Sequence, residues 1–416
     1  MIKYYCFKTA NDYGGEIMDY KKDFKFLEKN IIYFDNGATT LKPNRVIDKM
    51  NSYYYDYPSN AHRGDYNISM IASTEFEKTR DLVKEFINAN KREEIIFTSG
   101  STESINMVIY GYFMNNLKSG DEVLITKSEH ASVIIPWFDL ENKIGIKVKY
   151  IDLNEDYTFN VDNFKNMITP NTKVISIAEI TNVIGDKRDI KEITRIAHEN
   201  GIKVLVDASQ SIGHIKVDVT DTDVDFLAFS AHKMLGPTGV GVLYGKEELL
   251  KEISFIKGGG TSISFDSPKK IVYKDLPYKL EAGTQNIAGV IGFGEAIKYL
   301  NEMGMDYIEK YTNDLKEYLV SKLEDNENII MYNPRVEGSI LIFNVKDVFA
   351  QDTAIYLNNH DICVRAGDHC DKKLYDELGV KNTVRISLYF YNTKEEIDKL
   401  VKVLDNNNIL EESLGI

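Results

Sequence analysis

The chain has 416 residues, of which 43% are hydrophobic and 27% are charged, a composition typical of a globular protein long enough for two domains. Its net charge of −14 and the lack of a long Lys/Arg run argue against a nucleic acid partner. No run approaches ~20 apolar residues and no signal peptide is evident, so we expect no membrane contact. The three cysteines have neither disulfide nor metal-ligand spacing, so we expect a cytoplasmic protein without a metal site.

The first part of the chain alternates apolar runs with helical patterns. Residues 1–32 are polar and irregular, and we interpret them as an N-terminal arm. Near-continuous Val, Ile and Leu then occur in seven runs: 93–100, 122–126, 146–152, 172–181, 202–209, 225–231 and 239–245. Helical patterns such as 101–113 and 190–201 separate them, which predicts a mostly parallel, buried seven-stranded sheet flanked by helices. Residues 33–296 are therefore expected to form a large α/β domain, in which 258–284 breaks the rhythm and is predicted to be a loop.

After residue 297 the pattern changes. A helical spacing covers 305–325, strand-like runs follow at 339–345, 362–367 and 383–391, and a last helical pattern covers 394–406. This order predicts a second, smaller α/β domain over residues 297–416.

Polar side chains follow several of the predicted strands of the large domain. Ligands collect at the carboxyl ends of strands in open parallel sheets, so these residues are candidates for a common site. They are Ser101, Thr102, His130, Asn182, Asp207, Gln210, Ser230, His232 and Lys233.

Each of these residues alone has an ordinary explanation, such as a helix cap, a surface lysine or a core histidine. Their combination is more specific. Hydroxyls at a helix start suit a phosphate, a strand-end lysine such as Lys233 can form a Schiff base, and a strand-end carboxylate such as Asp207 can keep a pyridine nitrogen protonated. These are the parts needed to bind pyridoxal 5'-phosphate (PLP).

Motifs along most of the chain resemble one family. They are "YFDNGATT", "AHRGDY", "TSGSTESIN", "SEHASVIIPW", "TNVIGD", "VDASQSIGH", "FSAHKMLGPTGVGVLYG", "EAGTQN", "RAGDHC" and "VRISLYFYNT", in this order between residues 33 and 398. The chain is thus similar to fold-type I PLP-dependent transferases of the class V aminotransferase family, and within it to the group II (Suf-type) cysteine desulfurases.

The resemblance implies a role for each candidate in cofactor binding. Lys233 would carry the cofactor and move protons, and Asp207 would pair with the ring nitrogen. His130 would stack on the ring and could also move protons as a catalytic residue. Gln210 would contact the ring hydroxyl, and Asn182 would touch the cofactor or the substrate carboxylate. The phosphate would be held by Ser101, Thr102, Ser230 and His232, and in a homodimer with shared sites also by Thr284 of the neighbouring subunit.

Two further residues would define the reaction. Cys370 lies in a polar loop, which favours a reactive thiol over a buried structural one. Arg385 lies in an apolar strand, where it needs either a substrate carboxylate or an internal ion pair. The resemblance implies that Cys370 accepts sulfur from L-cysteine as a persulfide, which yields L-alanine, and that Arg385, Asn182 and Asn36 bind the substrate.

The resemblance also implies partners. A sulfur-acceptor protein would take the persulfide sulfur, with iron–sulfur cluster assembly as the expected use. Asp368 stands where the family more often has histidine, and "DKKL" follows Cys370 where a small residue and a nearby proline are usual. Three alternatives remain open: a selenocysteine lyase, a class V aminotransferase or epimerase that does not use Cys370, and a scaffold without activity.

Overall fold

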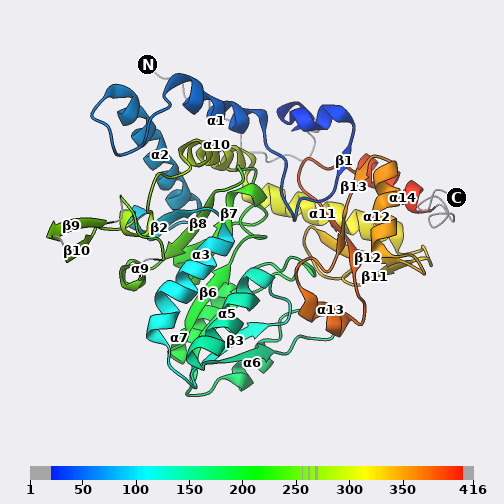
Figure 1. The fold of residues 1–416 in the computed structure, drawn as a ribbon. Helices are drawn as coiled ribbons and strands as arrows, with labels where there is room; N and C mark the ends of the chain where they lie inside the picture. Colours follow the sequence, from blue (N-terminus) through cyan, green and yellow to red (C-terminus); the bar gives the residue numbers. More distant parts are fainter. Residues whose placement is uncertain (1–19, 255, 261–262, 268–269, 406–416) are drawn as a thin grey trace.

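The computed structural model of the chain describes residues 20–254, 256–260, 263–267 and 270–405, with the backbone alone at 263–267 and 270 (Figure 1). Cys6 and most of the predicted N-terminal arm lie outside these residues. None of the helices in these ranges combines the length and the apolar character that crossing a bilayer requires.

A seven-stranded sheet forms the centre of the large domain, as predicted. Its strands lie in the order β2 (Ile95–Thr98), β8 (Gly241–Gly245), β7 (Phe226–Ser230), β6 (Lys203–Asp207), β5 (Thr172–Ala178), β3 (Glu122–Thr126) and β4 (Lys147–Ile151). Strand β8 runs antiparallel to both of its neighbours, β2 and β7, and the other strand pairs of this sheet are parallel. The mostly parallel order brings the carboxyl ends of β3, β5, β6 and β7 to one edge.

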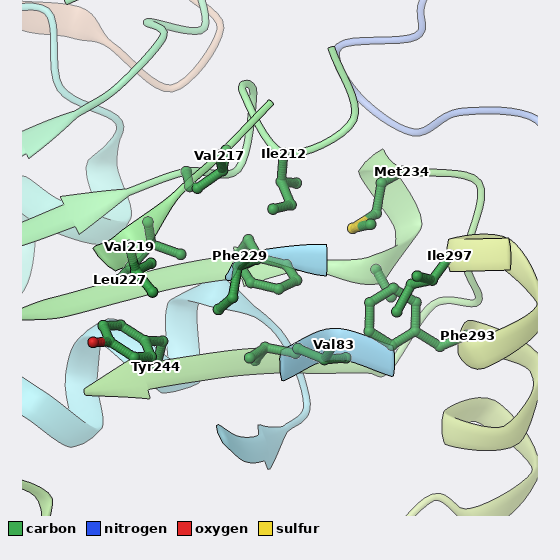
Figure 2. Close-up of a cluster of buried hydrophobic side chains, with 14 of the residues drawn as sticks. Val83, Ile212, Val217, Val219, Leu227, Phe229, Met234, Tyr244, Phe293 and Ile297 are labelled. Atoms are coloured by element: carbon green, nitrogen blue, oxygen red, sulfur yellow. The ribbon is translucent and has the colours of Figure 1, made fainter. Parts of the chain in front are cut away.

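Helices cover both faces of this sheet, which explains the near-continuous apolar runs. Along β7, Leu227 and Phe229 contribute to one hydrophobic cluster, and Phe226 and Ala228 to the other. The first cluster is covered by α1 (Asn44–Asp56), α2 (Asn67–Phe86), α6 (Val161–Met167), α7 (Ile190–Glu199) and α10 (Ile287–Met303). The second is covered by α3 (Ser101–Val108), α5 (Ala131–Ile144) and α9 (Glu247–Glu252). Figure 2 shows part of the first cluster, where Phe229 and Phe293 meet with ring centroids 6.5 Å apart.

The C-terminal part of the chain contains a second sheet, to which we refer as the small domain. An antiparallel sheet has the order β11 (Ile329–Met331), β12 (Ile340–Val345), β15 (Thr383–Ser387) and β14 (Arg365–Gly367). Its helices are α11 (Met305–Leu323), α12 (Ala350–Asn359), α13 (Lys372–Leu378) and α14 (Lys394–Leu404). In addition, β1 (Ile32–Tyr33) pairs in parallel with β13 (Ile362–Cys363), so this early strand joins the small domain. The short helices α4 (Met114–Asn116) and α8 (Val219–Thr222) belong to the large domain.

The sequence-based domain boundary at residue 297 falls inside a continuous helix. Helix α10 runs on to Met303, and its residues up to Leu300 pack in the core of the large domain. Gly304, with φ +84°, then separates α10 from α11. We therefore propose Gly304 as the boundary, because a helix that packs on one domain along its length moves with that domain.

The prediction of a loop over 258–284 was wrong in part. Residues Ile263–Ser267 (β9) and Lys270–Tyr273 (β10) form an antiparallel hairpin that projects from the large domain (Figure 1). Ile271, Val272 and Tyr273 are all exposed. Residues 263–266 alternate apolar and polar side chains, but this strand signal is short and lies in a segment rich in Gly, Ser, Pro and Lys, which favours a loop.

Candidate active site

A cavity of ≈ 230 Å³ lies where the large domain meets β14 and β15 of the small domain. Its walls come from the carboxyl ends of β3, β5, β6 and β7, from the start of α3, and from Arg365 and Arg385. This is the position at which open α/β sheets bind ligands. Ten of the predicted site residues line it: Ser101, Thr102, His130, Asn182, Asp207, Gln210, Ser230, His232, Lys233 and Arg385.

One end of the cavity is rich in hydroxyls at the start of α3. The backbone N–H of Ser101 donates to Ser230 Oγ (2.8 Å), and this hydroxyl donates to Ser101 Oγ (3.0 Å). A Cβ at Gly241 would lie 2.4 Å from Gly100 Cα, so only glycine lets β8 pass the turn before α3 at this distance. The N–H groups and hydroxyls of this helix start suit an anion such as a phosphate.

Lys233 and Asp207 bring opposite charges to the cavity. Lys233 ends a 3₁₀ turn, Ala231–Lys233, directly after β7, and Asp207 ends β6. Burial lowers the pKa of the Lys233 amine to about 8, and the Asp207 carboxylate partly opposes this shift. Asp207 Oδ1 accepts the N–H of Ser209 (2.9 Å). The neutral, nucleophilic amine is therefore more abundant near neutral pH than it is in an exposed lysine, although the ammonium form still predominates.

Two histidines in the lining are kept neutral. His130 caps α5, and its Nδ1 accepts the N–H of Ser132 (3.1 Å), which assigns the proton of the neutral ring to Nε2. Burial, and secondly the charge of Lys233, lowers the pKa of His130. Burial lowers the pKa of His232 to about 4, and Lys233 acts in the same direction. Neutral imidazoles at these positions can stack on a planar ring or donate to an anion without adding positive charge.

Arg385 is buried at the base of the small-domain wall. Its Nη1 donates to the carbonyl of Asn182 (2.7 Å), and its Nη2 lies 3.3 Å from Asp35 Oδ1. This ion pair is long for a charge-assisted bond, and Arg385 Nε has no partner in the described part of the chain. The internal ion pair considered from the sequence thus exists, but it leaves donors free for a carboxylate in the cavity.

Arg365 was missed by the sequence analysis. It lies opposite Arg385 across the β14–β15 pairing and lines the same cavity. The signal that identified Arg385, an arginine in an apolar strand, was also present in "ICVRAG". Gly37, Ala38, Ser132, Ser209 and His369 complete the polar and backbone lining that was not predicted.

Three predicted residues lie outside the lining. The structure does not support a substrate contact of Asn36, because its buried amide donates to Ser387 O (2.8 Å) and to Asn392 Oδ1 (3.1 Å). Thr284 is exposed and accepts a bond from Asn60 Nδ2 (3.3 Å), so its contact with a second subunit stays a prediction. Cys370 is exposed directly beside His369, and it is among the groups that influence the pKa of Lys233.

The comparison with family models agrees with this arrangement. The model described as aminotransferase class-V matches residues 32–400. The chain belongs to the class V aminotransferase family. Among the described residues of this family member, no group of three or more His, Cys, Asp or Glu could hold a metal ion.

Individual members of the class V aminotransferase family resemble the chain over nearly its full length. A probable cysteine desulfurase of Halalkalibacterium halodurans is 41% identical, over 92% of this chain and 96% of that protein. A cysteine desulfurase of Haloferax volcanii is 39% identical, over 96% of this chain and 98% of that protein. The apo structure of a cysteine desulfurase from Thermococcus onnurineus superposes with a TM-score of 0.90 at 34% identity, over 96% of this chain and 98% of that one.

Proposed function

We propose that this protein is a PLP-dependent cysteine desulfurase, which converts L-cysteine into L-alanine and retains the sulfur as a persulfide on Cys370. The observation that carries this proposal is one cavity in which Lys233, Asp207 and Arg385 meet, with an exposed thiol beside it. Relatives of that name, 39–41% identical over nearly the whole chain, support it.

The cavity residues fit the cofactor. The hydroxyls of Ser101, Thr102 and Ser230, together with His232, would hold its phosphate. Asp207 would pair with the ring nitrogen, His130 would stack on the ring, and Gln210 would contact the ring hydroxyl. When bound, PLP would supply an electron sink for negative charge at the substrate Cα.

Side chains of the protein would carry out the other steps. Arg385 would bind the substrate carboxylate, and Lys233 would remove and return the proton at Cα. The Cys370 thiolate would attack the substrate sulfur. A sulfur–sulfur bond forms as the carbon–sulfur bond breaks, the bonding electron pair stays with Cβ, and Cβ takes a proton to become the methyl group of alanine.

The persulfide would then pass to a sulfur-acceptor protein, and we propose iron–sulfur cluster assembly as its use. The exposure of Cys370 supports transfer to an external acceptor. A reducing compartment such as the cytoplasm would keep this free thiol available.

We further propose a homodimer whose interface includes the end of α1 and the start of α2. Large apolar side chains are exposed there: Tyr54, Tyr55, Tyr66, Ile68, Met70 and Ile71, of which Tyr55 is 81% and Met70 62% exposed. Such a concentration is unusual on the surface of a monomer, and it supports a protein interface at this position. A second copy is the occupant, because the predicted contact of Thr284 with a neighbouring active site requires one.

The dimer proposal predicts twice the 47.5 kDa chain mass in sedimentation experiments. Met70→Glu should raise the dissociation constant of the dimer by roughly tenfold or more, because the substitution buries a charge in an apolar contact. Ile330→Glu, at an exposed position on β11 of the small domain, is the control and should sediment as wild type. A wild-type protein that is monomeric and fully active would overturn the proposal.

The activity proposal predicts equal amounts of alanine and sulfide when the purified protein is incubated with L-cysteine, PLP and a thiol reductant. The reductant releases the sulfur from Cys370, which permits repeated turnovers. Product that depends on an added keto acid would indicate an aminotransferase instead. Neither product, together with no absorption from bound cofactor, would indicate a scaffold.

A further inference from the structure

Residues 368–371 form a left-handed turn that carries the thiol. The backbone φ angles of His369 and Cys370 are +50° and +63°. Two consecutive residues with side chains rarely adopt this conformation, since Cβ crowds the backbone. Such a turn persists only where the surrounding contacts favour it.

Asp368 closes this turn with two hydrogen bonds. Its Oδ1 accepts the backbone N–H of Cys370 (3.2 Å), and its carbonyl accepts the N–H of Asp371 (2.9 Å). An aspartate side chain that binds the backbone two residues later is well suited to stabilise a tight turn. The bond to Cys370 therefore depends on the residue type at position 368.

Two contacts from the large domain anchor the same turn. The N–H of Ala131, at the start of α5, donates to the carbonyl of Cys370 (3.0 Å). Asn182 Nδ2 donates to the carbonyl of His369 (2.8 Å). Because the carbonyl of Asn182 also accepts Arg385 Nη1 (2.7 Å), one residue connects the thiol-bearing turn to the arginine that faces the cavity.

The residue after the thiol is held as well. Asp371 is buried, and its Oδ1 accepts the N–H of Leu374 (3.3 Å) at the start of α13. Burial raises the pKa of its carboxyl group well above the usual range. The turn is thus fixed on both sides of Cys370, while the thiol itself stays exposed.

We propose that Asp368 is a positioning residue for Cys370. Its carboxylate holds the left-handed turn, and Asn182 and Ala131 fix that turn at a constant separation from Arg385. The thiol is then presented to a substrate whose carboxylate is bound by Arg385, without a search by a mobile loop. The effect of this arrangement on catalysis rests on the proposed function, whereas its effect on the conformation of the turn does not.

The test compares two substitutions of Asp368. Asp368→Ala removes the acceptor, and Asp368→Asn keeps an Oδ1 that can accept the same N–H bond. Hydrogen exchange, measured by mass spectrometry on peptides that cover 368–371, should be about tenfold faster in the alanine variant and close to wild type in the asparagine variant. Asp376→Ala, which removes an exposed acid on α13, is the matched control and should exchange as wild type.

Turnover gives a second measurement. In Asp368→Ala, kcat for alanine formation should fall by roughly tenfold while KM for cysteine stays unchanged, because Arg385 is untouched. In Asp368→Asn, kcat should be close to that of the wild type. Wild-type exchange in Asp368→Ala, or equal defects in the alanine and asparagine variants, would overturn the proposal. If exchange behaves as expected but the wild type forms no alanine, the turn is confirmed and the proposed function fails.

Discussion

Replacing Cys370 with alanine is expected to reduce alanine formation from L-cysteine by a factor on the order of 10³ or more. Breaking the carbon–sulfur bond requires a nucleophile on the substrate sulfur, and Cys370 is the exposed thiol beside the cavity. Cofactor binding and the change of its absorption on addition of cysteine should persist, since Lys233, Asp207 and Arg385 are unchanged. Chromatographic measurement of alanine, with the absorption spectrum of the same sample, checks both parts.

Cys363 provides the control for this experiment. It is only partly exposed, and it lies in β13, outside the cavity lining. Cys363→Ala should form alanine at the wild-type rate. Mass spectrometry of the wild type after a brief pulse of cysteine should find one extra sulfur on the peptide with Cys370. An extra sulfur on Cys363, or wild-type turnover in Cys370→Ala, would remove Cys370 from the reaction.

Lys233→Ala is expected to abolish both turnover and covalent attachment of PLP. After borohydride reduction and denaturation, the wild type should keep the cofactor on the peptide with Lys233, whereas the variant should release all of it. Lys42→Met is the matched control, because burial also lowers the pKa of Lys42, to about 7. The amine of Lys42 donates to the carbonyl of His232 (2.9 Å), and Lys42 does not line the cavity. Covalent cofactor in Lys233→Ala would show that another amine carries it.

The pKa of Lys233 predicts that the rate of covalent PLP binding depends on pH. Only the neutral amine attacks an aldehyde, and burial lowers its pKa from 10.5 to about 8. The rate at which cofactor-free protein binds PLP covalently should therefore be low well below pH 8, rise through about pH 8, and level off above it. Stopped-flow absorption would measure this profile. A midpoint near that of an ordinary lysine would contradict the buried position of the amine.

Local sequence patterns were sufficient for the large domain and for most of the cavity. Strands such as Lys203–Asp207 are buried on both faces, so their apolar runs are continuous and easily recognised. Several polar residues follow such runs, and their combination is specific although each alone has an ordinary explanation, which is why Asp207 and Lys233 could be selected. The same reasoning would have identified Arg365.

Other features depended on contacts between distant parts of the chain. Asn36 resembles a site residue in its motif, but its amide is used by Ser387 and Asn392, which lie more than 300 residues away in the sequence. The position of α10 and its end at Gly304 follow from packing on the large domain.

The sequence by itself was sufficient for the mostly parallel sheet and for selecting Lys233, Asp207 and Cys370 as candidates, because burial and local polarity leave a record in residue types. Only the tertiary structure decided how Cys370 is presented. Its left-handed turn depends on Asn182, 187 residues before His369, and on the start of α5, and hydrogen bonds between such distant segments form only once the domains have packed.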